Sequence, residues 1–113
     1  MQRKSGHRWR SVRPAVPDWT FLTNHAHVLL AVTRDPEARL RDVAGLVGIT
    51  ERATQRIVSD LEEGGYLTRT RDGRRNRYEV HADVPLRHPL ERDHAIGEIL
   101  GVLHDPRPEA AAP

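Results

Sequence analysis

The chain has 113 residues but no cysteine, a single lysine and no apolar run that approaches the length of a membrane span. Without cysteine, disulfide bonds, thiolate zinc sites and cysteine nucleophiles are excluded. A helix needs about 20 apolar residues to cross a bilayer, and no apolar stretch follows the basic N-terminus as it would in a secretory signal. We therefore expect one compact cytoplasmic domain that does not interact with a membrane.

The sequence also lacks the residue patterns on which catalysis depends. No nucleophile beside a base, no paired carboxylates and no phosphate-binding glycine loop occur with credible spacing. The nearest approach to a metal site matches no recognised ligand spacing and comprises His88, Glu91, His94 and Glu98. We interpret these as surface residues and expect no cofactor, no metal and no enzyme activity.

Basic charge is concentrated in two segments. Residues 1 to 18 have no periodicity and contain Arg3, Lys4, Arg8, Arg10 and Arg13. We interpret them as a flexible basic arm, which is either a minor-groove contact or a free tail. Five arginines also lie between residues 69 and 77, where Asp72 is the one acidic residue. A positive potential is therefore expected on one short element.

A supporting helix is predicted in the first part of the domain. Thr20 or Thr23 is positioned to cap it, and Asp35-Pro36 ends it after about Thr33. Apolar residues at positions 40, 43, 44 and 47 then indicate a short second helix. The residues at positions 48 and 50 complete the predicted helix-turn-helix.

Gly48 permits the left-handed conformation that ends the second helix, and Thr50 is positioned to cap the third. Gly64-Gly65 ends the third helix about four turns later. A tight turn between two helices is the arrangement that displays a DNA-contacting helix.

The third predicted helix, residues 50 to 63, has one apolar and one polar face. At about 100° per residue, one arc, which we assign to the core, contains Ala53, Ile57, Val58 and Leu61. The opposite arc contains Arg52, Gln55, Arg56 and Ser59, which we expect to bind DNA together with Thr50 at the start of the helix. A guanidinium can pair with guanine and a Gln amide with adenine, whereas the two hydroxyls suit phosphate. The alternative is a solvated face whose arginines pair with acidic neighbours.

Residues 66 to 71 and 76 to 81 predict two strands around Asp72-Gly73, a strong hairpin signal. We interpret the hairpin, residues 67 to 80, as a wing that contacts DNA through Arg69, Arg71, Arg74, Arg75 and Arg77. A hairpin with this much like charge is repulsive without an anionic partner. A merely solvated hairpin is the alternative.

Residues 90 to 103 predict a C-terminal helix with an apolar stripe of Ile96, Ile99, Leu100 and Leu103. The stripe packs either within the chain or against a second copy. The predicted fold class is mainly α with a small β-hairpin, a winged helix-turn-helix with a three-helix core, a two-stranded wing and a C-terminal helix. We divide the chain into a basic arm (1 to 18), a DNA-binding domain (19 to 81), a linker with the C-terminal helix (82 to 104) and a disordered tail (105 to 113).

Residues 19 to 81 resemble the bacterial winged helix-turn-helix transcriptional regulators of the MarR and related ArsR-like groups. The resemblance rests on Gly48-Ile49-Thr50, on residues 61 to 67 and on Asp72-Gly73-Arg74. It implies that the helix after the turn enters the major groove, that Asp72 orients the wing, and that Arg74 contacts the minor groove or phosphates. It also implies a homodimer.

Two functions are compatible with these observations. The first is a sequence-specific regulator of transcription, by default a nucleoid-associated repressor, that binds double-stranded DNA as a homodimer on a near-palindromic site. A small-molecule effector is compatible with it but not evident from the sequence. The second is a protein-docking module whose arginines meet an acidic partner. Trp9 and Trp19 could stack on a ligand, but a Trp19–Phe21 contact over the edge of the core is the simpler interpretation.

Overall fold

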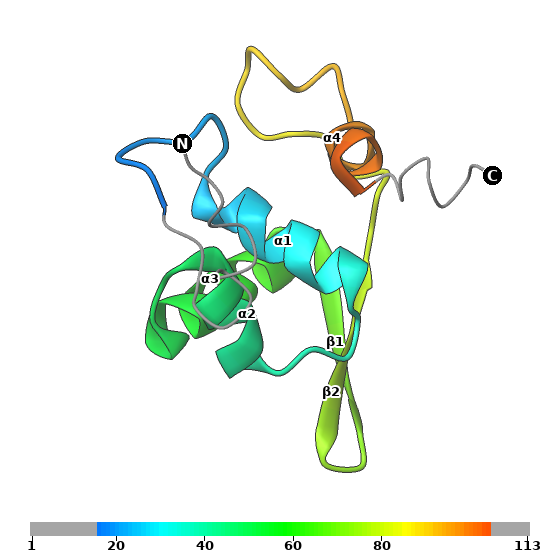
Figure 1. Ribbon diagram of the computed structural model, residues 1–113. Coiled ribbons are helices and arrows are strands. Elements are labelled where there is room, and N and C mark those ends of the chain that lie inside the picture. The colour runs from blue at the N-terminus through cyan, green and yellow to red at the C-terminus, as the bar shows by residue number, and fades with distance from the viewer. Residues whose placement is uncertain (1–15, 105–113) are drawn as a thin grey trace, which may run out of the picture.

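The computed structural model describes residues 16 to 104, which fold as a winged helix-turn-helix (Figure 1). Its elements are α1 (Asn24–Arg34), α2 (Leu40–Val47), α3 (Glu51–Glu63), β1 (Leu67–Asp72), β2 (Arg75–Val80) and α4 (Ile96–His104). The predicted fold class is confirmed. Trp9, the basic residues of the predicted arm and the predicted tail, residues 105 to 113, lie outside the described residues.

Local capping determines where the three core helices begin and end. The Thr23 hydroxyl accepts a hydrogen bond from the Ala26 amide at 3.4 Å, so Thr23 is the residue that caps α1. Thr50 caps α3 in the same way, with the Ala53 amide 3.0 Å from its hydroxyl. Gly48 ends α2 at a φ of 90°, in the left-handed region predicted for it. Only residues 48 to 50 separate α2 from α3.

The hydrophobic core lies between the four helices and the base of the hairpin. It consists of Val28, Leu29, Ala31, Val32, Val43, Val47, Ile57, Val58, Leu61, Tyr66, Leu67, Tyr78, Ile96 and Leu100. In Figure 1, α1 lies between α4 on one side and α2 with α3 on the other, while the hairpin extends away from the helices. The helix-turn-helix and the wing are thus positioned by the same core.

The buried face of α3 differs in one respect from the prediction. Ala53 is only partly buried, whereas Thr54 is completely buried. Thr54, Val58 and Leu61 follow the i, i+4, i+7 spacing of one helix face, which places Ala53 at the edge of that face. The Thr54 hydroxyl donates a hydrogen bond to the carbonyl of Thr50 at 2.8 Å, so its burial leaves no unpaired donor.

The hairpin is a two-stranded antiparallel ribbon whose register runs from Leu67↔Val80 to Asp72↔Arg75. Gly73 has a φ of 67°, which a glycine adopts without steric cost. The two strands are joined by residues 73 and 74, one position later than predicted. The Tyr78 amide donates to the carbonyl of Pro36 at 2.8 Å, so the loop between α1 and α2 runs along the edge of β2.

The C-terminal helix begins at Ile96 rather than at Leu90, and the predicted start was therefore wrong. The segment before it pairs with an extended stretch instead of forming helix. The Leu86 amide donates to the carbonyl of His94 at 2.9 Å, and the Ile96 amide donates to that of Val84 at 2.9 Å. These bonds satisfy the backbone groups that helical residues would have paired with one another.

The apolar stripe of α4 packs mainly within the chain. Ile96 and Leu100 are buried and belong to the core, whereas Leu103 is 40% exposed and Val102 is 76% exposed. None of the described helices, all within residues 24 to 104, has the length and apolar character of a membrane span.

The predicted contact between Trp19 and Phe21 is present. The ring centroids lie 5.0 Å apart, and the rings meet edge to face. The side chains are 68% and 91% exposed, however, so the pair does not cover the core as predicted. The two rings precede the cap of α1 and pack edge to face on each other.

Candidate nucleic-acid interface

The polar face of α3 is open to solvent. All the residues predicted to bind DNA from this helix are exposed, namely Thr50, Arg52, Gln55, Arg56 and Ser59. Ile57, Val58 and Leu61 anchor the opposite face in the core, so the exposed side chains lie on a helix of fixed orientation. The structure therefore displays one continuous polar helix face.

The two arginines of this face are not occupied by acidic neighbours. Within residues 16 to 104, no ion pair includes Arg52 or Arg56. Asp60, one of the acids that could have paired with them, instead lies 2.8 Å from His25 on α1. Glu62 likewise pairs with Arg69 of the hairpin. The guanidinium donors on α3 therefore remain available for an external acceptor.

The N-terminus of α3 offers one further donor. The Thr50 hydroxyl oxygen accepts the hydrogen bond from the Ala53 amide, and this leaves the hydroxyl proton free to point outward. Glu51 follows directly and is exposed. A carboxylate there is favourable for the helix dipole and unfavourable for a nearby phosphate.

The arginines of the hairpin do not share one face. Arg69 stands opposite the buried Tyr78 in the register, so Arg69 and Arg71 are on the side of the ribbon that packs toward the core. By the same alternation, Arg75 and Arg77 are on the other side. The sequence interpretation assigned all five arginines to one positively charged element. In the structure, the arginines of the strands lie on two opposite faces of the ribbon.

Three of the hairpin arginines are engaged by glutamates. Arg69 Nη2 lies 3.2 Å from Glu62 Oε1, which joins the hairpin to α3. Glu37, in the loop between α1 and α2, contacts both Arg77 at 2.7 Å and Arg75 at 3.8 Å. Sequence reasoning had missed both glutamates as partners. The pairs are 7 and 40 residues apart in sequence, outside any helical or strand spacing that would signal them.

The tip of the hairpin carries the remaining two arginines. Arg71 Nε donates to the carbonyl of Gly73 at 3.3 Å. Arg74 is exposed and forms no ion pair within the part of the chain that the structure describes. Asp72 lies opposite Arg75 in the register and is exposed. Arg74 is therefore the hairpin guanidinium with the fewest competing contacts.

The start of α2 adds two basic residues that the sequence interpretation had not included. Arg39 is the N-cap residue of α2 and makes no side-chain capping bond, and both Arg39 and Arg41 are exposed. Ser, Thr, Asp or Asn normally occupies such a position to accept a bond from the first-turn amides. An arginine at a cap, where no side chain accepts those amides, was the signal that could have marked this end of α2 as a candidate anion-binding surface.

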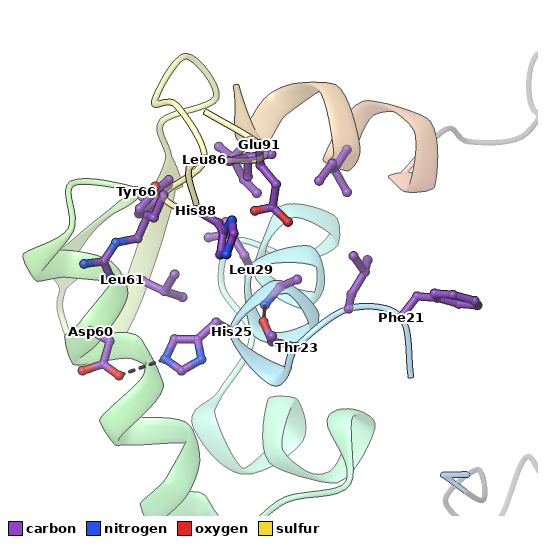
Figure 2. Close-up of a pocket in the computed structure, with 15 residues that line it drawn as sticks. Phe21, Thr23, His25, Leu29, Asp60, Leu61, Tyr66, Leu86, His88 and Glu91 are labelled. Carbon is purple, nitrogen blue, oxygen red and sulfur yellow. Dashed lines mark hydrogen bonds and ion pairs between the residues drawn. The ribbon is translucent and has the colours of Figure 1, made fainter. Parts of the chain in front are cut away.

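A pocket of about 390 Å³, separate from the polar face of α3, lies beside α1 (Figure 2). Its apolar walls include Leu29, Leu61, Leu86 and Ile96, which come from α1, α3, the segment after the hairpin, and α4. The volume suits a small organic molecule.

Polar groups lie on two sides of this pocket. His25 of α1 and Asp60 of α3 form a pair, with Nε2 and Oδ2 2.8 Å apart, and Figure 2 shows them facing each other between the two helices. His88 and Glu91 line the pocket from the segment that precedes α4. Helix α3 therefore contributes both to the lining of this pocket and to the exposed polar face.

The residues considered as metal ligands are not gathered into a site. His88 Nδ1 accepts a hydrogen bond from the Leu90 amide at 3.0 Å, and His94 pairs with Glu98 at 2.6 Å. Within residues 16 to 104, no three His, Asp or Glu side chains are grouped so that they could bind a metal ion. The Ala95 amide, and after it His94, lower the pKa of Glu98 below its ordinary value of 4.5.

No protein-family model matches the sequence, and no curated protein matches it. Among solved structures, the chain is similar to the PcaV transcriptional regulator from Streptomyces coelicolor in complex with its natural ligand, with 26% sequence identity and a TM-score of 0.47. The match covers 69% of this chain and 56% of that chain, so this chain corresponds to little more than half of that protein.

Proposed function

We propose that the protein binds double-stranded DNA as a sequence-specific transcriptional regulator, with α3 in the major groove and the hairpin on phosphates or the minor groove. The observation that carries this proposal is the exposed polar face of α3. Arg52 and Arg56 project from a helix whose other side is anchored in the core, and within residues 16 to 104 neither has an acidic partner.

The side chains of this face have the chemistry for base recognition. A guanidinium donates two parallel hydrogen bonds to O6 and N7 of guanine, and the Gln55 amide can pair with N6 and N7 of adenine. Thr50, Ser59 and the start of α2 supply donors for phosphates on either side. Arg74 extends these contacts at the tip of the hairpin, where Asp72 is proposed to orient the wing.

The resemblance to MarR-like regulators supports the finer parts of the proposal. A homodimer would place two copies of α3 about one helical turn apart along the duplex. Binding of such a dimer over a promoter would repress transcription, which is the mode that we propose. Cytoplasmic location and association with the nucleoid follow from the same function.

Two arginine substitutions test base and phosphate contacts separately. Arg56→Ala should broaden the set of sequences recovered by selection from a random duplex library, because it removes a base-edge donor. Arg74→Ala should weaken binding to every sequence alike and flatten the dependence of log K on log salt by roughly 0.9, because it removes one phosphate contact. Arg92→Ala, an exposed arginine before α4, is the matched control. Unchanged base selection in Arg56→Ala would remove that residue from the proposed site.

A protein-docking module is the alternative, in which the same arginines meet an acidic partner. Titration of random-sequence duplex at low and high salt separates the two. Salt-sensitive affinity supports DNA binding, because phosphate neutralisation releases counterions. Absence of any duplex affinity at low salt would support docking instead.

The pocket between α1, α3 and α4 favours a second, regulatory role as the site of a small-molecule effector. Its walls are mainly apolar, and the His25–Asp60 pair at its side links it directly to α3. A ligand that contacts this pair would act on the helix proposed to bind DNA. An uncharged apolar dye such as Nile red should bind the folded protein, and failure of the dye to bind would count against an open pocket.

A further inference from the structure

Glu37 lies at a fixed position beside the hairpin. Its amide donates to Asp35 Oδ1 at 3.1 Å, and the carbonyl of the preceding Pro36 accepts the Tyr78 amide at 2.8 Å. Figure 1 shows the loop between α1 and α2 passing beside the strands near their base. The backbone of Glu37 is therefore held against β2 by bonds that do not involve its own side chain.

The side chain of Glu37 faces two arginines at once. Oε2 lies 2.7 Å from Arg77 Nη1, and Oε1 lies 3.8 Å from Arg75 Nη1. Residues two apart on a strand share a face, so the two guanidiniums are neighbours on β2. All three side chains are about half exposed, and the cluster is therefore open to an external anion.

A carboxylate and a phosphate group compete for the same donors of a guanidinium. Both present two oxygens that accept parallel N–H hydrogen bonds. A phosphate that approaches Arg77 must displace the carboxylate or bind beside it, and in either case it meets an additional negative charge. Because exposed ion pairs are only marginally stable, such an exchange is energetically accessible.

We propose that Glu37 is an internal competitor that occupies Arg75 and Arg77 and lowers the affinity of the protein for DNA of any sequence. The inference rests on the proposed function, since it concerns the same surface. The hairpin then delivers less sequence-independent attraction than its arginine content suggests. A larger share of the binding free energy comes from α3, which is the element proposed to distinguish bases.

The substitution Glu37→Gln tests this directly. It removes the charge and retains the size of the side chain and one acceptor oxygen. Affinity for a labelled random-sequence duplex should rise roughly threefold to tenfold at moderate salt, and the dependence of log K on log salt should steepen by up to about 0.9, as expected for one additional phosphate contact. The readout is fluorescence anisotropy over a range of salt concentrations, with the full chain throughout.

Asp93→Asn, at an exposed carboxylate outside the pocket lining, is the matched control. It makes the same change in net charge, and Figure 1 places the segment before α4 at the end of the molecule opposite the tip of the hairpin. A second comparison is made in the Arg77→Ala background, where the gain from Glu37→Gln should fall by about half or more, because the nearer of the two arginines is absent. Thermal unfolding of each variant verifies that the fold is retained.

The outcomes separate the two proposals. Tighter binding and a steeper salt dependence in Glu37→Gln alone support the competitor. If the unsubstituted protein binds duplex but Glu37→Gln behaves like Asp93→Asn, the inference is overturned and the proposed function stands. Weaker binding by Glu37→Gln would also overturn it, because Glu37 would then present the arginines to DNA. Absence of duplex binding by every variant at low salt would overturn the proposed function and the inference together.

Discussion

Thr54 is a completely buried polar residue on α3, and its replacement tests which part of the side chain stabilises the helix in the core. Its hydroxyl donates to the carbonyl of Thr50 at 2.8 Å. The same carbonyl also accepts the Thr54 amide at 2.9 Å. Removal of the hydroxyl therefore leaves no buried acceptor without a partner, and the penalty for an unsatisfied group does not apply.

The expected free-energy changes indicate that the methyl group of Thr54 contributes more to stability than its hydroxyl does. Thr54→Val loses one hydrogen bond, worth about 1 kcal/mol net, and gains a buried methyl group worth about 0.8 kcal/mol. Its free energy of unfolding should remain within about 1 kcal/mol of the parent value. Thr54→Ser retains the hydroxyl and loses the methyl group, which should cost about 1 to 1.5 kcal/mol once the small cavity is included.

Urea denaturation followed by circular dichroism measures both variants, with an unchanged m-value as the sign that the two-state transition is intact. Thr54→Val should unfold at nearly the parent midpoint and Thr54→Ser at a clearly lower one. The reverse order, with a loss above about 2 kcal/mol for Thr54→Val and none for Thr54→Ser, would refute the reasoning. It would mean that the hydroxyl contributes more than its bond within the helix.

Two further predictions concern α4. Gly97→Ala should destabilise the protein by about 1 to 3 kcal/mol in the same assay, because the added Cβ would lie 2.6 Å from the Cβ of Ala82. Gly101→Ala, where a Cβ meets no atom within 4 Å, should instead be neutral or stabilising, and equal effects would exclude the clash as the cause. The lowered pKa of Glu98 implies stability that is present above pH 4.5 and is lost as the pH falls through the lower folded value. Acid titration followed by the Ala95 amide resonance should show this transition, and Glu98→Gln should abolish it.

The features that could be predicted from sequence are those whose energetics are local. Thr50 and Gly48 act on backbone groups within three or four residues, so the cap of α3 and the end of α2 were identified correctly. The start of α4 was not, because residues 94 to 96 pair with a stretch ten positions earlier. Glu98, whose carboxylate accepts the Ala95 amide at 3.0 Å, was the signal for the true start.

In the candidate site, too, some features could be predicted from the sequence and others could not. The polar face of α3 followed from helical periodicity, and its exposed residues were placed correctly on that face. The ion pairs of the hairpin did not follow from any period. Glu37 meets Arg77 only because the loop after α1 is bonded to β2. Whether an arginine is available to a partner thus depends on tertiary contacts, even where its position on a strand is predictable.

The bond between Tyr78 and Pro36 also bears on how the protein behaves at high concentration. An unpaired strand edge is a template on which a second chain can add, and this is a common route to aggregation. Here the loop covers the edge of β2 near its base, and the arginines give the rest of the ribbon a charge that repels an identical copy. The same residues that suit a polyanion therefore discourage self-association through the hairpin, and concentrated solutions should resist fibril formation best at low ionic strength.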